Sequence, residues 1–390
     1  MYDLIVKGGT LIDPAQSINE KMDVAIESGI VQEISRNISD DRSKKTIDAS
    51  GMFVTPGLVD IHTHSAFKIA GLCIDPEKAC LPKGTTTVVD AGSTGELLFS
   101  PFRKYVIDKP SKTRIFAFLN VESLGMIEFE NDQEWPKLLT DENERYFPLF
   151  VNVDRTISTI NENRDVIIGI KWAHHGINGL HLARKVCDDA GCILMMESHF
   201  MPDGLTYARQ GDIITHAYHR NKSQFTQTFD GMMDEDGKIR KEFFDAVKRG
   251  VLLDTGHGRG SFSWKTAELA LKDNLPPNTI STDLWTGNVE GPVHDLPTTI
   301  SKFLHLGMSL ENAIEASTSA PASAIKRLGE IGTLKPGSCA DLSIFKLLDG
   351  KFPLSDCYEE ARICEKLLTP IYVIRNGEAI LPDQKFAGKL

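Results

Sequence analysis

Two histidines one residue apart offer the clearest chemistry in this sequence. His62 and His64 close a short apolar segment that follows a Pro-Gly turn. Side chains two positions apart on a strand point to the same side, so a strand ending here would aim two imidazoles at one point. Imidazole is the commonest metal ligand in proteins. A lone His-x-His pair is also common on protein surfaces, so a metal site has to be argued from residues farther along the chain.

Five more residues of metal-binding type lie at the ends of later apolar segments. One such segment ends on Lys171, whose ammonium would be costly to bury without a partner. The amine could be paired or reach solvent along its stem, or it could have taken up CO2 as a carbamate, a carboxylate able to bridge two divalent ions. Glu197 with His199, then His216, then Asp283 end three further segments. Each histidine could be a satisfied structural group and Asp283 a helix cap, but such placements at successive segment ends favour one shared site.

The elements that must position these residues follow a βαβ pattern. Short apolar segments alternate with helical stretches such as 179–190 and 241–249, which is typical of a parallel sheet. This indicates an α/β fold, a (β/α)8 TIM barrel, whose active sites lie at the C-terminal ends of the strands. An open doubly wound sheet is the alternative, but no Gly-x-Gly-x-x-Gly follows the first strand. The predicted strands are 58–61, 86–90, 115–120, 166–171, 193–197, 212–215, 251–254 and 279–283.

Both ends of the chain predict β-structure without a catalytic cluster. Residues 1–53 contain short strand-like segments between Gly-Gly, Asp-Pro and Ser-Gly turns, and residues 329–390 contain two more. We therefore expect a small β-sandwich domain formed from both chain termini, 1–53 and 329–390, around a barrel over 54–328. At 390 residues the chain is long enough for a large barrel with such an appendage.

Composition excludes several classes of partner. The chain has 43 basic and 54 acidic residues, a net charge of −11, and its basic residues form no cluster. Nucleic acid or an anionic membrane is therefore not expected as a main partner. The seven cysteines form no Cys-x-x-Cys and are expected to be buried thiols. No apolar run approaches 18 residues and the first residues lack the pattern of a signal peptide, so we expect a cytoplasmic protein.

Taken together, these motifs resemble the amidohydrolase superfamily, specifically its dihydroorotase-like and deacetylase-like metallohydrolases. The resemblance spans essentially the whole chain, and it is the combination of motifs that is specific. The segments that carry it are Pro56–His64, Lys83–Gly92, Gly169–Lys171, Asp212–His216, Asp254–Gly258 with Ser261 and Phe262, Ser281–Asp283, Ser319–Ala322 and Gly337–Leu342.

The resemblance implies a centre of two divalent metal ions, expected to be Zn. His62, His64 and Asp283 would hold the more buried ion, the histidines of strands five and six would hold the second, and a carbamylated Lys171 would bridge the two. A hydroxide shared by the metals would be the nucleophile, with its pKa lowered by the cations. Asp283 would accept its proton and pass it to the leaving group, as general base and then general acid.

The strand-five position departs from the family pattern. In close relatives the histidine would align with Glu197, whereas in this chain His199 lies two residues later on the same face. Either side chain could ligate Zn, and we favour His199. At strand six we favour His216 over His219, because His216 directly ends the apolar run.

Substrate contacts are expected from the glycine-rich loop after strand seven. Its glycines, among them Gly258, permit close backbone approach to a ligand. Arg259 could bind a substrate carboxylate or could be a solvated surface residue. By the family resemblance, His257 would lie near the substrate and could hydrogen-bond to it.

The predicted function is hydrolysis of the C–N bond of an amide, a cyclic amide or an N-acyl (deacetylase-type) small molecule. The alternatives are an adenine-deaminase-like aminohydrolase, an esterase of acylated hydroxy acids, and a binding protein without metals. Lys171 favours the amide and ester hydrolases, because many deaminases of the superfamily lack this lysine. The resemblance also implies a homo-oligomer.

Overall fold

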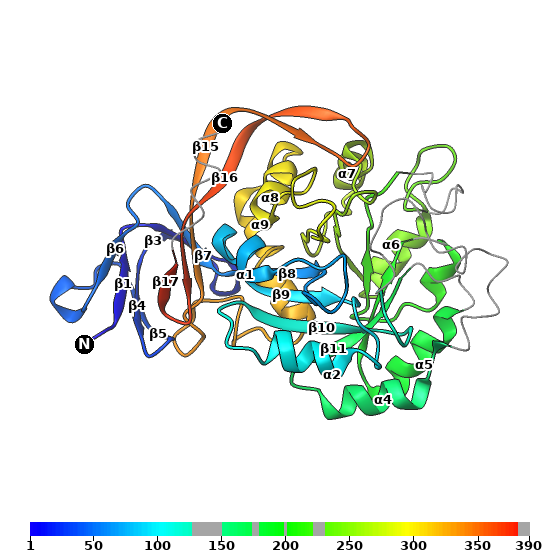
Figure 1. The fold of residues 1–390 in the computed structure, drawn as a ribbon. Coiled ribbons are helices and arrows are strands. Elements are labelled where there is room, and N and C mark those ends of the chain that lie inside the picture. Colours follow the sequence, from blue (N-terminus) through cyan, green and yellow to red (C-terminus); the bar gives the residue numbers. More distant parts are fainter. Residues whose placement is uncertain (127–149, 174–178, 199–200, 221–230, 381–390) are drawn as a thin grey trace.

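Seven parallel strands form the wall of a barrel in the computed structural model, which describes residues 1–126, 150–173, 179–198, 201–220 and 231–380 (Figure 1). They are hydrogen-bonded in the order β14-β13-β12-β11-β10-β9-β8, so neighbours in the chain are neighbours in the sheet. The strands are β8 (Leu58–Thr63), β9 (Thr85–Ala91), β10 (Arg114–Asn120), β11 (Ile167–Trp172), β12 (Ile193–Glu197), β13 (Ile213–Thr215) and β14 (Leu252–Leu253).

An irregular segment, residues 279–284, closes the barrel in the place of the predicted eighth strand. On one side the Thr255 N–H donates to the Thr279 carbonyl, 3.0 Å. On the other, the Asp283 N–H donates to the His62 carbonyl, 2.7 Å. The prediction of a regular strand over 279–283 is wrong: the segment bridges its neighbours only at single positions, and Asp283 has left-handed backbone, φ +50. The fold is nevertheless the predicted (β/α)8 barrel.

Helices pack around the outside of the strands (Figure 1). Side-chain caps fix several of their starts: Asn152 accepts from the Arg155 N–H, and Asp295 accepts from the Thr298 N–H. The helices are α1 (Pro76–Ala79), α2 (Phe99–Phe102), α4 (Val153–Glu162), α5 (Leu180–Ala190), α6 (Lys241–Lys248), α7 (Trp264–Lys272), α8 (Leu296–His305), α9 (Leu310–Glu315) and α10 (Ser319–Ala324). None of the helices that the structure describes is long and apolar enough to span a bilayer.

Both termini contribute to two further sheets beside the barrel. One has the strand order β5-β4-β1-β6 and the other β17-β16-β15-β7-β2-β3, so the second combines strands from both ends of the chain. Apolar residues of both sheets, including Val24, Leu11 and Ile344, share one buried cluster, as the sandwich prediction requires. The strands are β1 (Leu4–Lys7), β2 (Thr10–Asp13), β3 (Ile18–Lys21), β4 (Asp23–Glu27), β5 (Ile30–Ser35), β6 (Thr46–Asp48), β7 (Phe53–Pro56), β15 (Leu342–Ser355), β16 (Ala361–Arg375) and β17 (Glu378–Ile380).

The hairpin of β15 and β16 extends well beyond these sheets. It arches over α8 and reaches the end of the barrel near α7 (Figure 1). The Leu368 N–H donates to Ser301 Oγ of α8, 2.9 Å, and the Cys357 N–H at the hairpin tip donates to the Phe262 carbonyl, 3.1 Å. We call residues 345–370 the C-terminal arm. Two strand-like segments were predicted within 329–390, but neither the arm between them nor its contact with the barrel was predicted.

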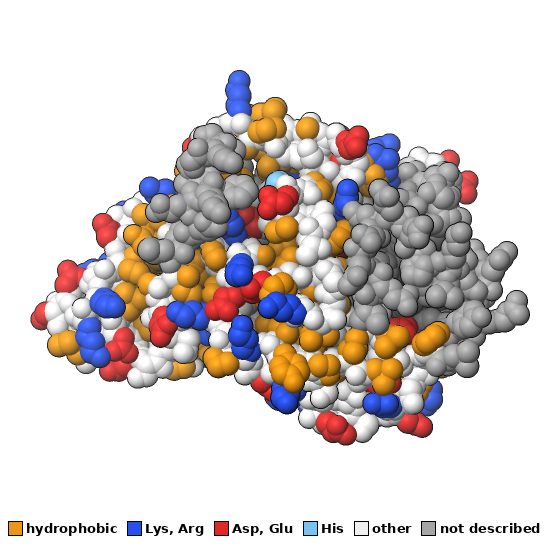
Figure 2. Space-filling view, viewed as in Figure 1, with side chains coloured by type: hydrophobic (Ala, Val, Ile, Leu, Met, Phe, Trp, Pro, Cys, Tyr) orange, Lys and Arg blue, Asp and Glu red, His pale blue; other side chains and the backbone are white. Residues whose placement is uncertain are grey.

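One face of the molecule is visible in Figure 2. Acidic and basic side chains are interspersed there among hydrophobic ones, and the described residues of this face show no continuous basic stripe.

Candidate metal centre

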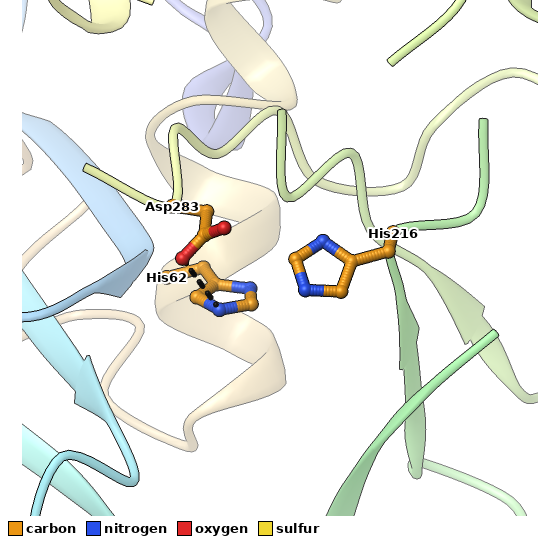
Figure 3. A group of neighbouring side chains, drawn as sticks. All are labelled: His62, His216 and Asp283. Atoms are coloured by element: carbon orange, nitrogen blue, oxygen red, sulfur yellow. Dashed lines mark ion pairs between the residues drawn. The ribbon is translucent and has the colours of Figure 1, made fainter. Parts of the chain in front are cut away.

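Polar side chains converge at the C-terminal ends of the barrel strands. His62 lies in β8 and His64 directly follows it, Lys171 comes from β11, His216 follows β13 directly, and Asp283 lies in the closing segment. Because the strands are parallel, their C-terminal ends meet at one rim. One ligand atom from each of His62, His216 and Asp283 lies within 4.8 Å of the others, and these three side chains point toward one another (Figure 3).

Short distances connect these residues into one cluster. His62 Nε2 lies 3.3 Å and His64 Nε2 3.0 Å from Asp283 Oδ1. Lys171 Nζ lies 3.2 Å from His62 Nε2. All of these side chains are buried, with Lys171 fully so. The structure thus brings together residues separated by more than two hundred positions in the chain.

The His62 ring is oriented by a hydroxyl and a carboxylate. Its Nδ1 lies 2.7 Å from Thr215 Oγ1, and the Thr215 hydroxyl donates to Asp254 Oδ2, 2.7 Å. Since that hydroxyl has one hydrogen and gives it to Asp254, it must accept from His62 Nδ1–H. Asp254 also accepts hydrogen bonds from Thr279 and Ser281. The lone pair of His62 is therefore on Nε2, which faces the cluster.

The other two histidines are fixed in the same form. His64 Nδ1 lies 2.9 Å from Ser93 Oγ, which donates to Asp90 Oδ2, 2.7 Å, and so must accept from the ring. His216 Nδ1 donates to the Gly256 carbonyl, 2.6 Å, because a carbonyl can only accept. All three rings therefore turn Nε2 toward the centre, which is the arrangement that metal-ligating histidines require.

These donor atoms fit a cation. The Nε2 lone pairs of His62 and His64 face a carboxylate oxygen of Asp283, so acceptors meet acceptors, an arrangement that a metal ion between them stabilises. Burial by itself raises the pKa of Asp283, whereas positive charge on His62, His64 and His216 outweighs it and holds that pKa well below its usual value; a cation bound at the same Nε2 atoms would act in the same direction. Asp283 is therefore an ionised carboxylate.

Lys171 is a buried amine at the centre of this cluster. Its Nζ lies 3.7 Å from Glu197 Oε1, and Glu197 Oε1 lies 3.5 Å from His216 Nε2. Burial lowers the pKa of Lys171, although Glu197 and Asp283 oppose the shift. A lowered pKa increases the neutral amine, which is the form that reacts with CO2.

The strand-five and strand-six alternatives are only partly described by the structure. Glu197 ends β12 within the cluster, whereas His199 lies outside the described residues. His219 is buried, and a Cβ added to Gly231 would come within 2.4 Å of its ring. His219 is thus packed against backbone, while His216 faces His62 with ring centroids 4.9 Å apart.

Backbone conformation at the centre is unusual. His216 and Asp283 both have positive φ, +58 and +50, a conformation that costs free energy for residues with a Cβ. Gly256 and Gly258 of the next loop are also left-handed, and a Cβ on Gly258 would lie 2.5 Å from Asp283 Oδ2. This loop therefore packs directly against two candidate ligands.

The three residues proposed for substrate binding lie in different environments. His257 is fully buried: Lys302 Nζ lies 2.7 Å from its Nε2, and its Nδ1 lies 3.0 Å from the Gly258 carbonyl. Gly258 is buried beside Asp283, and Arg259 is exposed. A substrate contact by any of the three stays a prediction.

Several residues that position the site were not singled out from the sequence. Asp60 accepts from the His62 N–H, 3.2 Å, and from the Thr282 N–H and hydroxyl, 3.1 and 2.6 Å, so it joins β8 to the closing segment. Burial raises the pKa of Asp60 to about 7. Asp90 and Asp254 were included only as parts of longer motifs. Their position at strand ends was the available signal. Ser93, the hydroxyl partner of Asp90, follows it by three residues, but the hydroxyl partners of Asp254 come from other segments of the barrel.

Comparison with known proteins agrees with this geometry. No family model matches the chain. The chain is 34% identical over 369 residues to a deacetylase of Brucella anthropi, and the alignment covers 91% of this chain and 86% of the relative. A solved adenine deaminase aligns with a TM-score of 0.84 at 29% identity, over 98% of this chain and all of that one. A solved dihydroorotase aligns with a TM-score of 0.83 at 29% identity, over 97% and 99%.

The two solved structures align with nearly the whole chain, so the alignments span both the barrel and the terminal sheets. Deacetylases and dihydroorotases both hydrolyse C–N bonds, so the same class of reaction follows for this chain. The chain belongs to the amidohydrolase superfamily.

Proposed function

We propose that the protein is a metal-dependent hydrolase of the C–N bond of an N-acyl, amide or cyclic amide small molecule. The observation that carries this is the convergence of the His62, His64 and His216 Nε2 atoms with Asp283 and Lys171. The N-acyl class comes first because the full-length relative is a deacetylase.

His62, His64 and Asp283 would hold the more buried of two divalent ions, and Lys171 as a carbamate would bridge it to the second. For the second ion we propose His216 and Glu197, since Glu197 Oε1 lies 3.5 Å from His216 Nε2. This changes our strand-five choice from His199. When bound, the ions would supply a hydroxide at neutral pH and polarise the substrate carbonyl.

The chain's own residues supply proton transfer and orientation. Asp283, ionised and beside the site of attack, accepts a proton and returns it to the leaving nitrogen, as a general base and then a general acid. Thr215 and Ser93 keep the ligating rings in one tautomer. Arg259, exposed beside the loop of Gly258, is our candidate to bind a substrate carboxylate.

The bridging carbamate forms when the neutral Lys171 amine attacks CO2, making an N–C bond and releasing one proton from nitrogen. Burial favours the neutral amine. The carbamate is an anion where the amine was neutral, and two bound metal ions would stabilise it.

A deaminase is the second candidate, because a solved adenine deaminase aligns over 98% of this chain. Lys171 argues for the amide hydrolase. Deamination of adenine without hydrolysis of any acyl or cyclic amide compound would make the deaminase the preferred function.

The first experiment measures metal content and turnover of the apo-protein reconstituted with Zn and bicarbonate. The substrates are N-acetyl and N-carbamoyl amino acids, cyclic ureides, acylated hydroxy acids and purines. We expect close to two Zn per chain and turnover of an acyl or cyclic amide compound. Absence of bound metal after reconstitution would contradict the proposal.

Lys171→Ala tests the bridging role in the same assay. We expect turnover and Zn content to fall together, because the carbamate is a shared ligand. Lys272→Ala, on the exposed end of α7, is the matched control and should change neither. Full Zn content in Lys171→Ala would assign this lysine a structural role only.

A further inference from the structure

A second fully buried lysine, Lys302 of α8, lies behind the site and takes no part in the proposed chemistry. Its Nζ has three acceptors at hydrogen-bond distance: His257 Nε2 at 2.7 Å, the Pro292 carbonyl at 2.9 Å and the Ser355 carbonyl at 2.7 Å. These acceptors belong to three separate segments: the loop after β14, the loop before α8, and the C-terminal arm. An ammonium has three hydrogens, so this set uses all of them.

The contact with Lys302 determines the protonation of His257. Burial lowers the pKa of Lys302 to about 8, so the side chain still carries its proton at neutral pH. Burial together with the charge of Lys302 lowers the pKa of His257 well below its usual value. The imidazole is therefore neutral, with Nε2 as acceptor and the hydrogen on Nδ1, 3.0 Å from the Gly258 carbonyl.

His257 is also held in place by packing on both sides. Its ring stacks on Phe262, with centroids 4.6 Å apart and planes 18° apart. Cys357 of the C-terminal arm places its thiol 3.3 Å from the carbonyls of His257 and Gly258. The ring thus has little freedom to turn once Lys302 fixes its Nε2.

The backbone on either side of His257 contacts two candidate metal ligands. The Gly256 carbonyl accepts from His216 Nδ1, 2.6 Å. The Gly258 N–H donates to the Thr282 carbonyl, 2.9 Å, and the Gly258 backbone lies close against Asp283 Oδ2. A displacement of His257 would therefore move both His216 and Asp283.

We propose that Lys302 is a positioning residue for the hydrolytic reaction: it holds His257 in the Nδ1–H form and thereby sets residues 256–258 against His216 and Asp283. This role rests on the proposed function, since it concerns the placement of the general base. It also makes the C-terminal arm, through Ser355, part of the support of the active site.

The test combines turnover with a direct reading of the tautomer. Lys302→Met removes the charge and the donor atom but keeps the unbranched apolar stem of the side chain. We expect kcat to fall roughly 10- to 100-fold, the range for loss of a residue that orients a ligand, with KM and Zn content changed less. Lys265→Met, on the exposed face of α7, is the control and should leave kcat unchanged.

NMR of the Zn-loaded protein with ¹³C- and ¹⁵N-labelled histidine reports the tautomer. The His257 signal is assigned by its loss in His257→Gln. We expect an unprotonated Nε2 in the unmodified protein, where Lys302 donates to it, and a hydrogen on Nε2 in Lys302→Met, because the ammonium that donates to this nitrogen and repels its proton is gone. An unchanged His257 signal in Lys302→Met would overturn the proposal, because a merely structural lysine would not set this tautomer.

A double-mutant cycle tests independently whether Lys302 acts through His257. If Lys302 acts through His257, Lys302→Met should reduce kcat less than 3-fold further when His257→Gln is already present, roughly within the limit of additivity error. Multiplication of the two losses would overturn the proposal. If Lys302→Met does not fold, His257→Gln alone decides: kcat must fall roughly 10-fold or more with Zn retained, and unchanged kcat rejects the role.

The tautomer can be read in a protein that turns over no tested compound. Failure of the proposed function therefore leaves the NMR result intact, whereas failure of the positioning role leaves the His257 signal unchanged in Lys302→Met even when the enzyme is active.

Discussion

The three candidate ligand histidines that the structure describes reach the same protonation state through different partners. His62 donates to a threonine hydroxyl, His64 to a serine hydroxyl and His216 to a backbone carbonyl. In the first two cases a buried carboxylate, Asp254 or Asp90, takes the hydroxyl hydrogen and so forces the hydroxyl to accept. The carboxylates thus orient the rings without touching them.

Thr215→Val is the residue-scale test of this orientation. Valine keeps the shape of threonine but cannot accept from His62 Nδ1, so the ring loses the partner that fixes its tautomer. We expect Zn affinity to fall about 10- to 100-fold. Competition with a chelator measures the change. Thr215→Ser keeps the hydroxyl and should restore most of the affinity; an equal loss in both variants would point to packing instead.

Asp283→Asn tests the general base. The amide keeps the size of the side chain but cannot take up a proton, so kcat should fall by about 10²–10⁴-fold while the fold and most of the metal are retained. Steady-state kinetics with parallel metal analysis checks both quantities. Asp273→Asn, on an exposed aspartate after α7, serves as control. Normal kcat in Asp283→Asn would remove the residue from proton transfer.

His62 and Lys171 could be placed at the centre because they lie at the ends of strands, and Asp283 because its segment, although irregular, closes the same barrel. His62, Lys171 and Asp283 needed only the rule that parallel strands end at one rim. Thr215 and Lys302 could not be found that way. The sequence does not indicate which hydroxyl on one strand faces which histidine ring on another. Lys302 is a lysine in a helix, and only the contacts of its Nζ distinguish it from other lysines.

At the scale of elements, the loop after β14 joins the barrel strands to the site. Gly258→Ala would force alanine into left-handed backbone, at a cost of about 1 kcal/mol or more, and would place a Cβ 2.5 Å from Asp283 Oδ2. We expect lower stability and a severe loss of turnover. Gly191→Ala is the matched control: φ is +65, but its Cβ would meet nothing within 4 Å.

Denaturant unfolding and kcat separate the two effects. Both glycine variants should lose stability through the left-handed backbone, Gly258→Ala more because of its contact with Asp283, and only Gly258→Ala should lose turnover. Equal kcat in the two variants would show that the clash is absorbed without moving Asp283.

The sequence predicted the strands and helices whose position depends only on the hydrophobic pattern. The barrel strands from β8 to β14 lie within a few residues of the predicted ranges. The closing segment was predicted as regular because Ile280 is apolar, yet its geometry is set by Asp60, Asp254 and the left-handed Asp283. The arm was missed because its outer half alternates weakly and packs on α8, a contact that sequence periodicity does not report.

At the scale of the whole molecule, Asp341 joins the barrel to the terminal sheets. Its carboxylate accepts from Arg114 of β10, 2.5 Å, and from Arg375 of β16, 3.1 Å, and it is only 4% exposed. Asp341→Ala would leave two largely buried guanidinium groups without their shared anion. Removing one partner of a buried pair costs about 3–5 kcal/mol.

We expect the free energy of unfolding of Asp341→Ala to fall by roughly that amount. Chemical denaturation followed by tryptophan fluorescence measures it. Asp349→Ala is the control, since its pair with Lys366 is exposed and contributes little. A change below about 1 kcal/mol would mean that the junction depends on apolar contacts instead.

The path of the C-terminal arm has a consequence for any attempt to obtain a minimal enzyme. A fragment cut at residue 328 would contain every candidate metal ligand and every barrel strand. It would lack Ser355, which holds Lys302, and Tyr358, whose hydroxyl donates to the Gly260 carbonyl. The last sixty residues therefore cannot be discarded as an accessory: a shortened protein would bring the loop over Asp283 to solvent without its outer support.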